Sequence, residues 1–120
     1  MNPEHHVGMF KATDSFAIDA YSASRSLKGG KGRLIASEIR RTAVESGGAV
    51  VAASASEPGG EQERRHLQRA RASLMESRYY LYLARRFGLL DLKRYRLLAS
   101  RQDAALRELE SFLRSARRAG

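Results

Sequence analysis

Residues 67–88 read LQRARASLMESRYYLYLARRFG, and this stretch decides the fold. Small or apolar residues return at every third or fourth position along it, which is the spacing of one face of an α-helix. The members of this face are Leu67, Ala70, Leu74, Ser77, Leu81, Ala84 and Gly88. The sequence therefore predicts a helix from about Glu61 to Phe87, roughly 40 Å long at a rise of ~1.5 Å per residue.

A second apolar patch lies on another side of the same helix and consists of Ala72, Met75, Tyr79, Leu83 and Phe87. A surface helix needs only one apolar stripe. Two stripes indicate burial against two neighbours, one of them a second subunit. Met75, Tyr79, Leu83 and Phe87 are therefore the expected oligomer interface.

A first helix is expected to follow an N-cap at residues 13–15. It carries Phe16, Ala20, Ala23 and Leu27 on one face, at the spacing of a helical stripe. The glycine-rich segment that follows ends this helix.

A second helix is expected from about Arg33 to Ser54. Its inner face is narrow and built of small residues, which lets a neighbour approach closely. Gly47 and Gly48 in its middle cost about 1 kcal/mol each relative to alanine, which predicts a bend or a tight crossing there. Residues 56–60, with a proline and two glycines, form the next break.

A fourth helix is expected beyond Gly88, which closes the third helix, and Asp91, which caps the next. Its apolar face runs in steps of three and four residues from Tyr95 to Ala116. No segment alternates with period two for long enough to predict a strand. The sequence thus predicts an all-α, up-and-down bundle over residues 14–118, preceded by a mobile tail over residues 1–13.

Positive charge is concentrated in the second half of the chain. The sequence has 22 Lys and Arg against 13 Asp and Glu, a net charge of +9. Residues 1–60 contribute 7 basic and 6 acidic side chains, whereas residues 61–120 contribute 15 and 7. Such an excess favours anionic partners but carries no information about the fold.

Arginines recur every seven residues along the third helix, at Arg64, Arg71, Arg78 and Arg85. A heptad drifts only about 20° around a straight helix, so these side chains form a ridge about 32 Å long. Guanidinium groups donate in a fixed fork that suits phosphate oxygens, which makes the ridge a candidate nucleic-acid-binding surface. The alternative is a solvated flank whose arginine stems cover apolar edges.

Three tyrosines lie near the ridge, at Tyr79, Tyr80 and Tyr82. Aromatic rings can stack on nucleic-acid bases. Tyrosines at helical spacing more often bury the ring and keep the hydroxyl in water, which favours core or interface positions.

Metal and nucleotide motifs are absent from the sequence. It has no cysteine, which excludes disulfides, thiolate zinc sites and cysteine nucleophiles. His5 and His6 fall in the expected tail, and His66 stands outside any zinc-binding pattern. Residues 28–33 lack the spacing of a phosphate-binding loop.

The sequence also gives no support for acid–base catalysis. Glu76, next to the apolar face of the third helix, is expected to pair with Arg69 or Arg78. Nothing in the sequence supplies the partner, metal or cleft that acid–base catalysis needs. We therefore expect no enzyme activity, no metal and no cofactor. With neither a signal peptide nor an apolar run near the ~20 residues needed to cross a bilayer, a cytoplasmic protein without membrane contact is expected.

Two parts of the chain resemble a known family. Residues 35–44, IASEIRRTAV, are similar to the L-x-x-Q-I-R-R-A-A-V segment of the four-helix-bundle proteins encoded in 23S rRNA intervening sequences. Residues 70–76, ARASLME, and residues 81–90, LYLARRFGLL, are similar to the family's A-x-G-S-L-x-E and L-x-x-A-x-x-L-G-Y-L motifs. The likeness covers roughly residues 14–115.

The chain departs from the family after the first motif. Where the family continues S-I-P-A-N-I-A-E-G, residues 45–53 read ESGGAVVAA. Gly47 thus replaces the proline, Ala49 the asparagine and Ala52 the glutamate.

The resemblance implies an all-α, up-and-down left-handed four-helix bundle and, in relatives, a ring of five protomers. It implies no catalytic residues. A related bundle, the accessory variability determinant of diversity-generating retroelements, is similar in being basic and pentameric and in associating with a reverse transcriptase and nucleic acid. Arg40 and Arg41 match the R-R pair of the family motif, as weaker nucleic-acid-binding candidates or, equally, as salt-bridge residues between helices or subunits.

Together these features predict a non-enzymatic, homo-oligomeric protein, a pentamer by resemblance, that binds RNA or another nucleic acid. A reverse transcriptase is the enzyme partner that the resemblance suggests. The alternative is a pure assembly module, whose arginines meet acidic groups on a protein partner.

Overall fold

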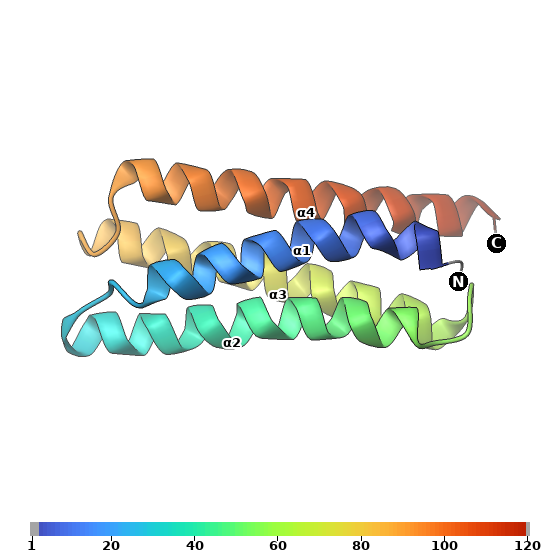
Figure 1. Cartoon of the computed structure of the whole chain (residues 1–120), viewed down its shortest axis with the longest axis horizontal. Helices are drawn as coiled ribbons and strands as arrows, with labels where there is room; N and C mark the ends of the chain where they lie inside the picture. The colour runs from blue at the N-terminus through green and yellow to red at the C-terminus, as the bar shows by residue number, and fades with distance from the viewer. Residues whose placement is uncertain (1–2, 120) are drawn as a thin grey trace.

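Four α-helices follow one another along the chain: α1 (Pro3–Ser24), α2 (Gly29–Ser54), α3 (Glu61–Arg86) and α4 (Leu92–Ala119). The computed structural model describes the backbone of residues 3–119 and the side chains of residues 6–115. Each helix runs antiparallel to the one before it, and α4 returns to lie beside α1 (Figure 1). The described part of the chain contains no strand. The prediction of an all-α, up-and-down four-helix bundle is therefore confirmed.

The core lies where the 3-4 spacing placed it. Of the members of the predicted α3 face, Leu67, Leu74 and Leu81 are fully buried. Large side chains from the other helices meet them, among them Phe16 of α1 and Leu109 of α4. The four helices thus bury one continuous apolar interior, as the pattern requires.

The α2–α3 pair is packed through small residues. Ala43 and Ala49 of α2 are fully buried, as is Ala70 of α3. The hydroxyls of Thr42 and Ser77 lie 2.7 Å apart across the same contact. Small side chains let the two backbones approach closely, as the narrow face of α2 predicts.

The turn between α3 and α4 confirms the predicted stop and start signals. Gly88 has φ +72°, a left-handed conformation that glycine adopts without a Cβ clash. The backbone N–H of Leu89 then donates to the Ala84 carbonyl at 2.9 Å. At the start of α4, Asp91 Oδ1 accepts the backbone N–H of Arg94 at 2.7 Å, which is an N-cap hydrogen bond.

The expected tail over residues 1–13 is wrong from Pro3 onward, because α1 begins at Pro3. His6, Met9 and Thr13 are buried and extend the stripe of Phe16 by another three turns. Thr13 therefore lies inside the helix and does not cap it. The burial of these side chains against the other helices outweighs the local cap signal. Residues 1–2 lie outside the described part of the chain.

Helix α2 also differs from its expected course. It begins at Gly29, before the expected Arg33. Gly32 in its first turn packs against the Leu27 backbone, where an added Cβ would lie 2.8 Å from the carbonyl carbon. A Cβ on Gly47 or Gly48 would meet nothing within 4 Å, so no neighbour crosses tightly there. The helix continues without a break through both glycines, and the expected tight crossing is wrong.

Candidate nucleic-acid interface

The arginine ridge lies on the flank of α3 that faces α4. Arg71 Nε donates to Glu110 Oε1 at 3.3 Å. Arg78 Nη2 donates to Asp103 Oδ1 at 2.5 Å and to the Ala99 carbonyl at 3.0 Å. The two central arginines of the ridge are therefore tied to acceptors on α4.

Buried Gln102 fixes Arg78 further. Its amide oxygen accepts a hydrogen bond from Arg78 Nε, and its amide nitrogen donates to the Leu74 carbonyl. Gln102 is fully buried, and a buried amide needs such partners. The contact holds the Arg78 side chain along the α3–α4 seam rather than out in solvent.

The register of these pairs shows what faces the outer arginines. Moving seven residues along α3, from Arg71 to Arg78, moves the partner seven residues back along α4, from Glu110 to Asp103. The next step brings Arg85 to the level of Arg96. Two cations therefore lie at the same level there, and neither has an ion pair with a carboxylate in the described part of the chain.

The two ends of the ridge are exposed. Arg64 and Arg85 form no ion pair within the described residues. The predicted four-arginine ridge is thus brought together on one flank, but it is divided: its two central arginines are ion-paired with α4, whereas its two ends form no ion pair within the described residues.

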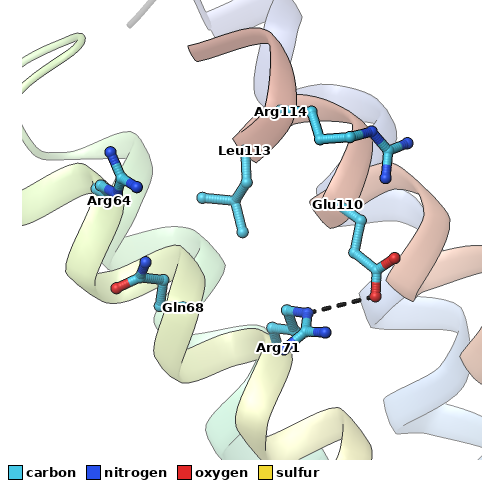
Figure 2. Close-up of a pocket in the computed structure, with 6 residues that line it drawn as sticks. All are labelled: Arg64, Gln68, Arg71, Glu110, Leu113 and Arg114. Carbon is cyan, nitrogen blue, oxygen red and sulfur yellow. Dashed lines mark hydrogen bonds and ion pairs between the residues drawn. The ribbon is translucent and has the colours of Figure 1, made fainter. Parts of the chain in front are cut away.

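Arg64 borders a cleft of about 500 Å³ between α3 and α4 (Figure 2). Residues from both helices line this cleft: Arg64, Gln68, Arg71, Glu110, Leu113 and Arg114. Figure 2 shows Gln68 between the two α3 arginines, with Leu113 entering the gap from α4. Among its described lining residues, the cleft therefore combines guanidinium donors with a carboxylate, an amide and an apolar side chain.

Further cations surround the ridge. Among the described side chains, the arginines and lysines of α3 and α4 that have no carboxylate within ion-pair distance are Arg64, Arg69, Arg85, Arg86, Lys93, Arg94, Arg96, Arg107 and Arg114. Among the described side chains, more of the unpaired cations thus lie on α3 and α4 than on α1 and α2, and we call the outer surface of α3 and α4 the basic face.

The three tyrosines differ in exposure, which bears on the two predicted roles, base stacking and a core or interface position. Tyr80 is half-buried, and its hydroxyl donates to Glu76 Oε2 at 2.9 Å. Tyr79 and Tyr82 are exposed. The guanidinium of Arg86 lies 6.0 Å from the centroid of the Tyr82 ring, at the edge of cation–π range.

Arg40 and Arg41 lie in contacts between helices. Arg40 Nε donates to Ser24 Oγ at 2.8 Å and so joins α2 to α1. Arg41 Nη2 lies 2.8 Å from Glu38 Oε2 on its own helix and 2.7 Å from Glu76 Oε2 on α3. Arg41 thus forms the interhelical salt bridge that was one of the two roles predicted for this pair, whereas Arg40 joins two helices through a serine hydroxyl.

The predicted partner of Glu76 is therefore wrong. Residues two apart on a helix point to different sides, and residues seven apart lie two turns apart, so neither Arg78 nor Arg69 meets Glu76. Its hydrogen bond from Arg41 lowers the pKa of the Glu76 carboxyl, and a second one lowers the pKa of Glu38. The Glu76 carboxylate in turn raises the pKa of Tyr80.

The expected oligomer interface on α3 is mostly exposed. Met75, Tyr79 and Phe87 are about half exposed, at 50%, 56% and 47%. Leu83 is half-buried and packs against the core instead. Met75 and Tyr79 thus form an outward apolar surface on α3, which we call the α3 face.

A second apolar surface was not anticipated from the sequence. Helices α1 and α2 also expose aliphatic side chains: Val7, Ile18, Leu34, Val44 and Val51. Val44 and Val51 are seven residues apart and lie on one side of α2, which we call the aliphatic face. The sequence signal that could have indicated it is the run of residues 42–56, in which Glu45 is the only charged residue. A solvated helix face normally carries more charge.

The structure also reveals a buried polar pair that sequence reasoning missed. His6 and Glu63 are both 3% exposed, and His6 Nε2 lies 3.6 Å from Glu63 Oε2. Glu63 also accepts the backbone N–H of Gly59 at 3.1 Å. The pair joins the start of α1 to the start of α3. The His5 side chain lies outside the described residues.

Within the described part of the chain, no group of three or more His, Asp and Glu side chains could hold a metal ion. None of the described helices combines the length and the apolar character needed to cross a bilayer. In comparisons with known proteins, no family model and no curated sequence matches the chain.

Proposed function

We propose that this chain is a non-enzymatic, cytoplasmic accessory protein that binds RNA along its basic face and assembles into a homo-oligomer. The observation that carries the proposal is the set of unpaired arginines and lysines on α3 and α4. Guanidinium groups without carboxylate partners are free to bind phosphate oxygens, and such contacts supply most of the affinity for nucleic acid.

Exposed apolar side chains support the assembly part of the proposal. Met75 and Tyr79 protrude from α3, while Val44 and Val51 protrude from α2. Two different apolar surfaces on one subunit suit a head-to-tail contact, which closes into a ring when the rotation between subunits permits. The resemblance to the bundles encoded in 23S rRNA intervening sequences supports the same arrangement, with five protomers and a reverse transcriptase as partner.

The test is binding of a single-stranded RNA oligonucleotide, measured by fluorescence anisotropy from 50 to 300 mM salt. If one arginine from each helix contacts a phosphate at each end of the ridge, four phosphates are neutralised, and the log–log slope is about −3 per protomer. Absence of binding at 50 mM salt would contradict the proposal and favour the alternative, an assembly module whose arginines meet an acidic protein.

A matched pair of variants distinguishes RNA binding at a local site from attraction by the net charge of the protein. Arg64→Glu with Arg85→Glu reverses the two ridge ends, whereas Lys11→Glu with Arg33→Glu makes the same charge change at exposed positions of α1 and α2. We expect the first variant to weaken RNA binding about 100-fold, because two charge-assisted contacts are lost, and the second about threefold. Equal losses would mean that net charge alone attracts RNA.

A further inference from the structure

The cleft between α3 and α4 distinguishes this part of the basic face from an open row of cations. Its volume of about 500 Å³ lies within the ~300–1,000 Å³ range typical of small-ligand sites. A row of surface arginines needs no cleft to contact a phosphate backbone. The cleft therefore suits a ligand that has an uncharged group to occupy its volume in addition to a charged group.

The charges around the cleft favour an anion. Of the described residues that line it, three are arginines and one, Glu110, is a carboxylate. Glu110 engages Arg71 through Nε alone, and no other hydrogen bond of Arg71 is formed within the described residues. Both terminal nitrogens of Arg71 are thus left to bind an anion. The Arg64 guanidinium forms no hydrogen bond or ion pair with the side chains that the structure describes.

The spacing of the two α3 arginines favours two anionic groups rather than one. Arg64 and Arg71 are seven residues apart, so their Cα atoms are about 10 Å apart along the helix axis. Gln68 lies between them in Figure 2, and Leu113 reaches into the gap from the other side. An uncharged ligand group placed between two phosphates would therefore contact the amide of Gln68 and the apolar side chain of Leu113.

A nucleoside with a phosphate on each side has this chemistry. We propose that the α3–α4 cleft holds one unpaired nucleotide of a single strand, with its flanking phosphates on Arg64 and Arg71. The base lies against Leu113, and the Gln68 amide reaches its edge. A duplex keeps its bases stacked inside, so the cleft selects single-stranded over double-stranded RNA. This inference rests on the proposed RNA binding and assigns its ligand class.

The ridge provides its own control. Arg64 and Arg85 occupy equivalent heptad positions, are both exposed and both lack an ion pair within the described residues, but only Arg64 lines the cleft. If phosphate contacts along an open ridge explain binding, Arg64→Ala and Arg85→Ala weaken it equally. If the cleft holds a nucleotide, Arg64→Ala weakens it more.

The experiment measures the affinity of the protein for an eight-residue uridine strand and for an RNA duplex of the same length, both at 100 mM salt. We expect Arg64→Ala to weaken single-strand binding about tenfold and Arg85→Ala about threefold, with little difference between the two on the duplex. Gln68→Ala, at an exposed position, should lower single-strand affinity and leave duplex affinity unchanged.

A small-ligand titration tests the cleft directly. Uridine 3′,5′-bisphosphate, which has a phosphate on each side of one nucleoside, is compared by calorimetry with pyrophosphate, which has charge but no nucleoside. We expect the bisphosphate to bind at least tenfold more tightly, with that advantage lost in Gln68→Ala. Equal binding of both ligands, or equal effects of Arg64→Ala and Arg85→Ala, overturns the cleft while leaving RNA binding intact. Loss of all RNA binding by the unmodified protein overturns the proposed function instead.

Discussion

The α1–α2 half and the α3–α4 half of the bundle bury similar interiors but present different surfaces. Residues 1–60 carry nearly balanced charge, and α1 and α2 expose aliphatic side chains such as Ile18 and Val44. Residues 61–120 carry eight more basic than acidic side chains, and their outward arginines are largely unpaired. The core requires only the inner stripe of each helix, so the outer stripes are free to serve different partners.

The two halves also differ in how their arginines are used. On α2, Arg40 and Arg41 join neighbouring helices through Ser24 and Glu76. On α3, only the centre of the ridge is tied down, and the ends stay free. Residue type alone therefore does not separate a structural arginine from a binding one, whereas the position of the nearest acceptor does.

The largest expected effect comes from disabling each apolar surface in turn. Met75→Glu with Tyr79→Glu places charge on the α3 face, and Val44→Glu with Val51→Glu places it on the aliphatic face of α2. Burying an unpaired charge in an interface costs several kcal/mol. We expect each double variant to fall from an oligomer to a single 13.4 kDa chain in size-exclusion chromatography with light scattering.

Mixing the two double variants sharpens this result. In a head-to-tail assembly each variant keeps one intact surface, and the two intact surfaces are complementary. The mixture should therefore form a dimer of twice the chain mass, although neither variant does so alone. A mixture that stays monomeric contradicts the head-to-tail contact, and a monomeric unmodified protein contradicts assembly altogether.

The fold could be predicted because the apolar stripe of each helix repeats over many turns. The core side of α3 and the cap at Asp91 follow from spacing and local chemistry. The start of α1 could not be predicted, because His6 is buried against Glu63 of α3 and Phe112 of α4, which the local sequence does not contain.

The candidate site was predictable in part for a similar reason. The heptad places the four ridge arginines on one flank of α3 whatever surrounds them. Which of them stay free depends on the register of α4, which brings Glu110 and Asp103 to the two central ones. That register is a tertiary property. The cleft beside Arg64 likewise exists only between two helices.

A smaller effect is expected at the contact between the two halves, where Arg41 lies close to Glu38, Glu45 and Glu76. The Arg41 hydrogen bonds depress the pKa values of Glu38 and Glu76 below the ordinary 4.5. A depressed carboxyl pKa adds stability above the unfolded value, and this stability is lost as the pH falls through the folded value. We expect the free energy of unfolding, from urea titrations, to fall between pH 7 and pH 3 partly for this reason.

Arg41→Gln should lower stability at pH 7 and reduce this loss on acidification, because three carboxylates then repel one another until they are protonated. Arg65→Gln is the control, since it removes a more exposed ion pair with Glu61 inside α3 and should keep the unmodified pH profile. Identical pH profiles for Arg41→Gln and the unmodified protein would show that the Arg41 cluster does not stabilise the fold.

The smallest effect tests the aliphatic face at its centre. Gly48 is exposed on α2, four residues after Val44 and three before Val51, and a Cβ there meets nothing within the subunit. Gly48→Ala should therefore stabilise the isolated subunit by about 0.5–1 kcal/mol, through the lower entropy of the unfolded chain. Thermal unfolding in the Met75→Glu, Tyr79→Glu background measures this gain without assembly. Gly32→Ala is the opposite control, since its Cβ would meet the Leu27 backbone at 2.8 Å and should lower the Tm.

The same substitution in the assembled protein then reports on what covers α2. If a neighbouring subunit packs closely over Val44 and Val51, the added methyl at residue 48 reduces that contact, and the gain in Tm shrinks or reverses on assembly. An equal gain in both backgrounds means that the neighbour does not reach this part of α2. In that case the aliphatic face is not the partner of the α3 face, even if both are needed for assembly.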